Sequence, residues 1–195
     1  MPKRKVKFAH GCYYHIYNRG AGKQSIFRRE QDYVELLWLM KELAVECCIT
    51  IMVYCLLPNH YHWLVRQDGA ITPAKFVGRV FGSYSQSFNL TYRRSGTLFE
   101  GPYEAILVDT DEYLHHLCCY IHANPVRHGL AMDPALWPYS NYLEWLGQRQ
   151  GTMVDRAFVQ SHFPNISHYQ ARVHSYLTGQ VTLPPGLRHY LESLE

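Results

Sequence analysis

The pattern of apolar and polar residues predicts short strands alternating with longer helices. The Tyr- and Ile-containing segment of about 11–18, closed by the turn-prone residues 19–22, is typical of a strand. Apolar residues then recur with helical spacing over about 30–46, and the segment of about 48–57 is almost continuously apolar, as in a buried central strand. The residues that set the helical spacing are Val34, Leu37, Leu39, Met40, Leu43 and Ala44.

The residues after position 57 also predict strands that alternate with helices. Pro58-Asn59 predicts a tight reversal into another strand, so that the two strands form a hairpin. Acidic residues near position 111 suit the start of a late helix, and we expect Pro125 to end it. The predicted elements after the reversal are a strand at about 60–66, a helix at 72–92, a loop at 96–102, a strand at 103–108 and a helix at 111–124.

The resulting order, βαββαβ and then a helix, predicts an α+β fold. We expect a ferredoxin-like antiparallel sheet with helices on one face, followed by a tyrosine-bearing helix and a helical C-terminal extension. The extension begins after a turn at Trp137-Pro138-Tyr139-Ser140 and includes helical stretches at about 141–147, 154–162 and 167–178. The predicted organisation is a basic N-terminal arm at 1–9, a main α+β domain at 10–130 and the extension at 131–195, packed on the same domain.

The composition favours a protein with its own hydrophobic core over a secreted or membrane-spanning one. Of 195 residues 47% are hydrophobic, which is enough for a sizeable core. The six cysteines form no C-x-x-C motif, and we expect a reduced, cytoplasmic protein. No apolar signal core and no segment long enough to cross a membrane is present in this sequence, so we expect no membrane partner.

Basic residues are clustered although the net charge is only +3. Taken singly, each cluster is more typical of a solvated surface. Sixteen Tyr, eight Phe and four Trp accompany them, and aromatic faces beside cations are typical of proteins that bind unpaired nucleotides. The clusters are Lys3-Arg4-Lys5 with Lys7, then Arg28-Arg29, Arg93-Arg94 and Arg127-His128.

His60 and His62 are the strongest chemical signal. Side chains alternate along a strand, so these two imidazoles project from one face of the sheet and form half of a metal site. Because the chain has 12 histidines, the His-x-His spacing alone is a weak signal, and two structural histidines are an equally good interpretation of it.

Tyr120 and Asn124 lie one turn apart on the predicted helix at 111–124 and therefore share a face. A tyrosine hydroxyl there is a candidate nucleophile for a phosphodiester, and the amide oxygen is a candidate third metal ligand. By helical spacing alone Tyr120 is more typical of packing, and Tyr113 is nearly as good a nucleophile.

Several ordered motifs together resemble the REP-associated tyrosine transposases, a branch of the single-tyrosine transposases in the HUH superfamily of single-strand endonucleases. The resemblance extends from about residue 10 to 178. The matching segments are Tyr14-His15-Ile16-Tyr17-Asn18-Arg19-Gly20, Tyr54-Cys55-Leu56-Leu57-Pro58-Asn59-His60-Tyr61-His62, Gly96-Thr97-Leu98-Phe99, Tyr120-Ile121-His122-Ala123-Asn124-Pro125-Val126-Arg127 and Trp137-Pro138-Tyr139-Ser140. Pro102 stands where relatives commonly have Arg, and Leu57 replaces a frequent Met.

The resemblance implies a metal-dependent transposase that cleaves and rejoins single-stranded DNA at palindromic REP-like hairpins through a 5′-phosphotyrosine intermediate. It implies Tyr120 as nucleophile, His60 and His62 as metal ligands with Asn124 in the place of a polar ligand, and Mg²⁺ or Mn²⁺ as the cofactor. His116 is a candidate helper in proton transfer, and the role of His15 stays open. The candidate DNA-binding residues are Lys3, Arg4, Lys5, Arg19, Arg93, Arg94 and Arg127.

Two alternatives remain open at this point. A catalytically silent DNA-hairpin-binding protein would keep the fold and use the histidines structurally, and a hydrolytic metal-dependent RNA nuclease would use water in place of Tyr120. The sequence does not decide between a monomer and a homodimer, or whether Tyr120 serves its own sheet or a partner's.

Overall fold

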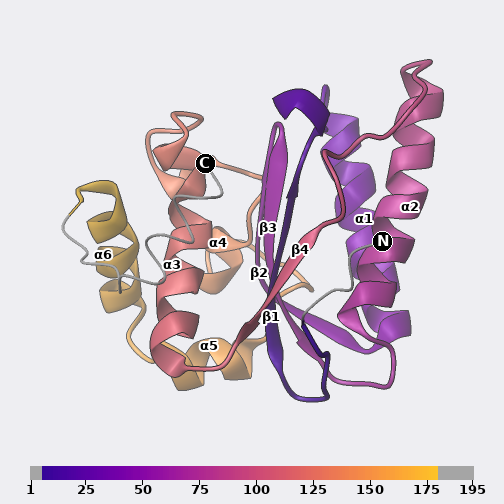
Figure 1. Cartoon of the computed structure of the whole chain (residues 1–195). Coiled ribbons are helices and arrows are strands. Elements are labelled where there is room, and N and C mark those ends of the chain that lie inside the picture. The colour runs from indigo at the N-terminus through magenta and orange to yellow at the C-terminus, as the bar shows by residue number, and fades with distance from the viewer. Residues whose placement is uncertain (1–5, 180–195) are drawn as a thin grey trace.

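A computed structural model describes residues 6–179, and its centre is one four-stranded sheet (Figure 1). Lys3, Arg4, Lys5 and the tail from about residue 180 lie outside the described residues. The strands are β1 (Tyr13–Arg19), β2 (Ile49–Leu57), β3 (His60–Gln67) and β4 (Glu104–Val108). They are arranged in the order β2-β3-β1-β4, and every neighbouring pair is antiparallel, as predicted for the ferredoxin-like layer.

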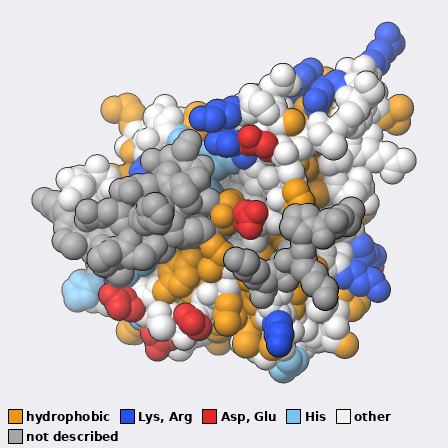
Figure 2. All heavy atoms as spheres, in the orientation of Figure 1, with side chains coloured by type: hydrophobic (Ala, Val, Ile, Leu, Met, Phe, Trp, Pro, Cys, Tyr) orange, Lys and Arg blue, Asp and Glu red, His pale blue; other side chains and the backbone are white. Residues whose placement is uncertain are grey.

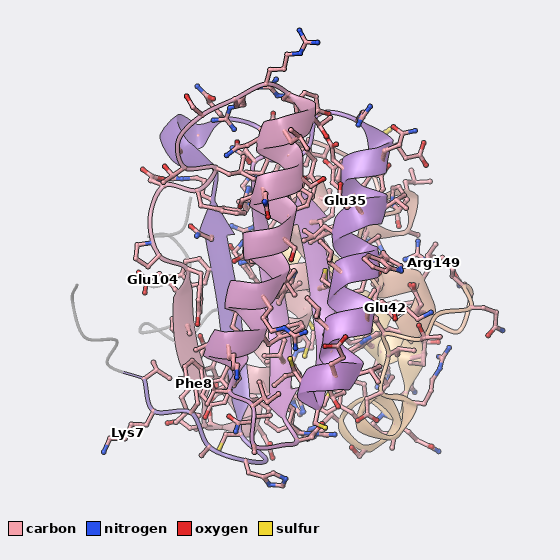
Figure 3. All side chains as sticks on the ribbon, turned by 90° about the vertical axis from the view of Figure 1, so that its right-hand side faces the viewer. Lys7, Phe8, Glu35, Glu42, Glu104 and Arg149 are labelled. Carbon is pink, nitrogen blue, oxygen red and sulfur yellow. The ribbon has the colours of Figure 1, made fainter. Side chains whose placement is uncertain are left out.

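Two long helices cover one face of the sheet, α1 (Glu30–Cys47) and α2 (Pro73–Thr91) (Figures 1 and 3). Leu36, Met40 and Ala44 face the core from α1 because they recur at helical spacing. Tyr61 and Trp63 project from β3 into this same core, so their neighbours His60 and His62 must project from the opposite face.

The opposite face is covered by α3 (Asp111–Arg127), with α4 (Tyr142–Trp145), α5 (Arg156–His162) and α6 (Ile166–Leu177) packed around it (Figure 1). Short 3-10 turns occur at Ala21–Lys23 and Pro134–Leu136. Within residues 6–179, no helix combines the length and apolar character needed to span a membrane.

The prediction that Pro125 ends the tyrosine-bearing helix was wrong, because α3 continues to Arg127. A proline removes its own N–H from a helix and its ring crowds the carbonyl four residues earlier, but here it is buried in the last turn, where packing favours the helix. The helix is closed by Gly129, two residues after its last residue, whose φ of 66° is left-handed. There the N–H of Leu130 donates to the Pro125 carbonyl and the N–H of Gly129 to that of Val126, which closes the helix with a Schellman motif.

The prediction that residues 48–57 form a central strand was wrong, because β2 lies at the edge of the sheet. The strand is buried all the same, because the segment that was predicted as a turn at residues 137–140 covers its outer edge. Leu56 N–H donates to the Tyr139 carbonyl, and Cys55 forms an isolated antiparallel bridge with Ser140. The pairing of β2 with β3 is irregular between Ile51 and Val53. The carbonyl of Met52, at this irregularity, accepts hydrogen bonds from Asn141 Nδ2 and Trp145 Nε1. The C-terminal extension is therefore anchored directly to the sheet.

Candidate active site

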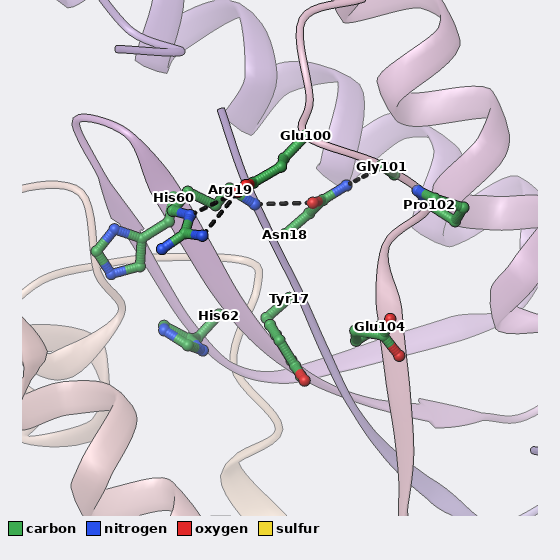
Figure 4. Close-up of a pocket in the computed structure, with 9 residues that line it drawn as sticks. All are labelled: Tyr17, Asn18, Arg19, His60, His62, Glu100, Gly101, Pro102 and Glu104. Atoms are coloured by element: carbon green, nitrogen blue, oxygen red, sulfur yellow. Dashed lines mark hydrogen bonds and ion pairs between the residues drawn. The ribbon is translucent and has the colours of Figure 1, made fainter. Parts of the chain in front are cut away.

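Strand register places the candidate histidines in rows with residues of β1. His60 lies opposite Arg19, and His62 lies opposite Tyr17. Tyr17 lies in turn opposite Glu104 on β4. Side chains directly opposite one another project from the same face of a sheet, so one row runs from His62 through Tyr17 to Glu104 (Figure 4).

Both histidines have a hydrogen-bonding partner at Nδ1. Asn59 Oδ1 lies 2.7 Å from His60 Nδ1, and His15 Nε2 lies 3.1 Å from His62 Nδ1. An amide oxygen only accepts, so His60 carries its proton on Nδ1 and leaves the Nε2 lone pair for a ligand. A metal on His62 Nε2 would likewise require the proton on Nδ1, which His15 is placed to accept.

Burial keeps these imidazoles neutral. Desolvation lowers the pKa of His60 to about 3, and the nearby His128 and Arg19 add to the decrease. The pKa of His62 is lowered well below its usual value, mainly by burial and further by the nearby His15, His60, His128 and Arg127. A neutral imidazole has the lone pair that a divalent cation requires.

Tyr120 on α3 faces the histidine pair. Its ring is 1% exposed and lies edge-on to the His62 ring, with 5.6 Å between the ring centroids. The Arg127 guanidinium lies 5.2 Å from the centroid of the tyrosine ring. Helix α3 packs against β2 of its own chain, so Tyr120 and the histidines meet within one polypeptide.

Asn124 supplies an oxygen that the protein leaves unused. The side chain is completely buried, and its Nδ2 donates to the Tyr120 carbonyl at 3.0 Å. Its Oδ1 accepts no hydrogen bond from the described residues, which is costly for a buried oxygen. Within residues 6–179, no group of three or more His, Cys, Asp or Glu side chains is placed to hold a metal. Two neutral imidazoles and an amide oxygen are donors of the kinds that divalent cations accept.

Tyr113 lies near Tyr17 of the site, and His116 contacts α6. Burial raises the pKa of Tyr113, with contributions from Tyr17 and Asp109. His116 Nδ1 hydrogen-bonds with the hydroxyl of Tyr176 on α6, so its ring belongs to the contact between α3 and α6. A role for His116 in proton transfer stays a prediction.

The candidate DNA-binding arginines form two groups. Arg19 and Arg127 lie near the histidine pair, and both contribute to the lowered pKa values there. The Nε and Nη2 atoms of Arg19 bind Glu100 Oε2 at 2.8 and 2.7 Å. Arg93 and Arg94 follow the end of α2, where Arg94 lies over the Phe88 ring at 5.6 Å.

Two hollows flank His60. One has a volume of about 320 Å³ and extends from His60 and His62 to the edge strand β4 (Figure 4). The other, of about 330 Å³, is lined by Lys23, Ser25 and His128 among others. Many Lys and Arg side chains gather at the upper end of the molecule in Figure 2, where β1 ends and β3 begins in Figure 1.

Sequence reasoning gave no role to Asn59 and left that of His15 undecided, although both contact the histidine pair. The signal for Asn59 was its position directly before His60. His15 is 47 residues from His62 in the chain, and only the pairing of β1 with β3 brings the two rings together.

Comparisons with known proteins concern the family and the overall fold. The model of the family described as "Transposase IS200 like" matches residues 8–124. The solved structure of a REP-associated tyrosine transposase bound to a REP hairpin is 16% identical, with a TM-score of 0.63, and the match covers 80% of this chain and 94% of that one. A candidate transposase from Deinococcus radiodurans R1 is 13% identical, with a TM-score of 0.43 and coverage of 58% and 92%. No match was found among curated proteins.

Proposed function

Because the chain belongs to the IS200-like transposase family, we propose that it cleaves and rejoins single-stranded DNA through a covalent bond to Tyr120. One observation carries this proposal, the edge-on contact of the Tyr120 ring with His62. It brings a candidate nucleophile to the two imidazoles that have the features of metal ligands. In a protein that only bound DNA hairpins, nothing would require this meeting of groups.

The residues that would hold a Mg²⁺ or Mn²⁺ ion are His60, His62 and Asn124. The buried Asn124 oxygen that accepts no hydrogen bond from the described residues supports this assignment, as do the neutral histidines with their Nδ1 atoms engaged. When bound, such a cation polarises the scissile phosphate and stabilises the negative charge that develops on its oxygens.

In the proposed reaction, Tyr120 Oη forms a bond to the phosphorus atom while the bond from phosphorus to the 3′-oxygen breaks. The tyrosine proton leaves to solvent or to a base, and the departing oxygen takes up a proton to become a free 3′-hydroxyl. The downstream strand stays attached as a 5′-phosphotyrosine. Attack by a 3′-hydroxyl on that ester reverses the step, so rejoining needs no external energy source.

The proposed substrate is single-stranded DNA that carries a REP-like hairpin. The hairpin-bound transposase with the same fold supports this choice, as do the basic residues close to the histidine pair. Arg19, Lys23 and Arg127 are proposed to contact phosphates near the cleavage site, and Arg93 and Arg94 a more distant part of the DNA. The arm with Lys3, Arg4 and Lys5 is proposed to contact DNA as well.

The test uses wild-type protein, Tyr120→Phe and Tyr113→Phe with Mn²⁺ and end-labelled single-stranded palindromic DNA. The Tyr113→Phe variant is the matched control, because it removes a hydroxyl from the same helix. We expect a denaturation-resistant adduct on the downstream fragment with wild type and Tyr113→Phe, and none with Tyr120→Phe. Cleavage that survives Tyr120→Phe would identify a hydrolytic nuclease, and binding without any adduct would identify a silent hairpin-binding protein.

A further inference from the structure

The hollow between the histidine pair and the edge strand β4 has the features of a nucleotide site. Its volume is about 320 Å³. It adjoins His60 and His62, so a nucleotide in it would be next to the phosphate held at those residues. Side chains of different chemistry form its walls, namely Tyr17, Asn18, Arg19, Glu100, Pro102 and Glu104.

The loop that forms one wall is fixed to the end of β1. Asn18 Nδ2 donates to the Gly101 carbonyl at 3.0 Å, and the Glu100 N–H donates to the Arg19 carbonyl at 2.9 Å. Phe99, on the same loop, forms an isolated antiparallel bridge with Gly20, which directly follows β1. The wall therefore has a defined shape before a ligand binds, which reduces the entropic cost of binding.

The end of the hollow at β4 carries a carboxylate. Glu104 is exposed, and among the described residues it has no ion-pair partner, whereas Glu100 at the rim is neutralised by Arg19. An unpaired carboxylate would repel a DNA phosphate. It can accept hydrogen bonds from the edge of a base, provided that the base presents N–H groups.

Resting on the proposed function, we propose that this hollow binds the base of one unpaired nucleotide beside the scissile phosphate, and that Glu104 selects guanine there. The ring of Tyr17, which stands between His62 and Glu104, provides an aromatic surface for the base (Figure 4). Guanine presents two adjacent N–H donors, at N1 and N2, to the two carboxylate oxygens. Adenine and cytosine present one amino group beside a ring acceptor, and thymine presents one N–H between two carbonyls.

The test is a binding selection with hairpin DNA that carries ten randomised unpaired nucleotides on one side of its stem. Full-length wild type, Glu104→Gln and Glu42→Gln are compared. Glu42 is the matched control, because it is an exposed carboxylate on α1, in the layer on the other side of the sheet (Figure 3). We expect wild type and Glu42→Gln to enrich guanine over thymine about tenfold at one unpaired position. The Glu104→Gln variant should lose most of this preference at that position and keep the others.

A second arm replaces the selected guanine by inosine, which lacks only the N2 amino group. Wild type should lose several-fold in affinity and Glu104→Gln almost none. An unchanged base profile in Glu104→Gln, or an equal loss at every position, would overturn the proposal. The selection measures binding without cleavage, so a missing tyrosine adduct would refute the proposed reaction and leave this result standing. Failure of wild type to bind any DNA would refute both.

Discussion

His15 Nε2 lies 3.1 Å from His62 Nδ1, in the buried interior of the sheet face that carries the candidate active site. The pKa of His15 is lowered to about 3 by burial, so its ring is neutral and can accept a hydrogen bond. His15 is therefore placed to orient the ring of a proposed metal ligand. Replacing a hydrogen-bonding partner of this kind typically lowers metal affinity by roughly 10- to 100-fold.

His15→Leu is expected to weaken Mn²⁺ binding by about tenfold or more, because His62 loses the acceptor for its Nδ1 proton. His15→Gln should retain most of the affinity, since its amide oxygen can occupy the place of Nε2. Isothermal titration with Mn²⁺ measures both, and His168→Leu, on an exposed turn of α6, is the control. Equal affinities for Leu and Gln variants would exclude the orienting role.

Glu100→Gln is expected to strengthen binding of single-stranded DNA about threefold at low salt. The substitution frees Arg19 from its ion pair and removes a negative charge from the rim of the hollow. Anisotropy of a labelled 20-mer at two salt concentrations measures the change. Glu46→Gln is the control, because it breaks an exposed pair with Arg79 that joins α1 and α2 on the other side of the sheet. The same gain in both variants would point to net charge alone.

Asn141→Ala is expected to lower the free energy of unfolding by about 3 kcal/mol, since several buried groups would lose their partner at once. Asn141 Oδ1 accepts from the Tyr54 N–H and lies 2.9 Å from His122 Nε2, while its Nδ2 donates to the carbonyls of Met52 and Met153. Urea unfolding measures the change, with the exposed Gln148→Ala as control. A loss under 1 kcal/mol would mean that water replaces the side chain.

Gly20→Ala is expected to destabilise the protein by about 2 kcal/mol through overpacking. A Cβ atom at Gly20 would lie 2.1 Å from the backbone oxygen of Gln24, so the turn after β1 must move. The Gly20 N–H also donates to the Asn59 carbonyl at 2.8 Å, so a shift of this turn would move the residue next to His60. DNA cleavage should therefore decrease together with stability. Gly78→Ala is the control, because that glycine lies in α2 with open space around its Cβ position. Thermal unfolding compares the two variants, and equal midpoints would contradict the clash.

Local sequence patterns were sufficient to predict most of the helices and strands. The helix predicted at 30–46 spans Glu30–Cys47, and the strands predicted at 48–57 and 60–66 span Ile49–Leu57 and His60–Gln67. Local patterns were sufficient here because the helix α1 buries one side, whereas β2 is buried on both faces and is therefore almost continuously apolar. The end of α3 was mispredicted because Pro125 is a strong local signal against a helix, whereas the Schellman closure at Gly129 and the burial of Pro125 favour its continuation.

The sequence by itself determined which residues share a face, because the geometry of a strand puts His60 beside His62 and that of a helix puts Tyr120 beside Asn124. Only the tertiary structure decided which of these faces meet, and that His15, Arg19 and Glu104 join them. Register between strands depends on the packing of whole faces and on hydrogen bonds between segments far apart in the chain, so no local pattern contains it. The contact of Tyr120 with His62 likewise depends on α3 packing over the sheet, which the C-terminal extension stabilises through Asn141 and Trp145.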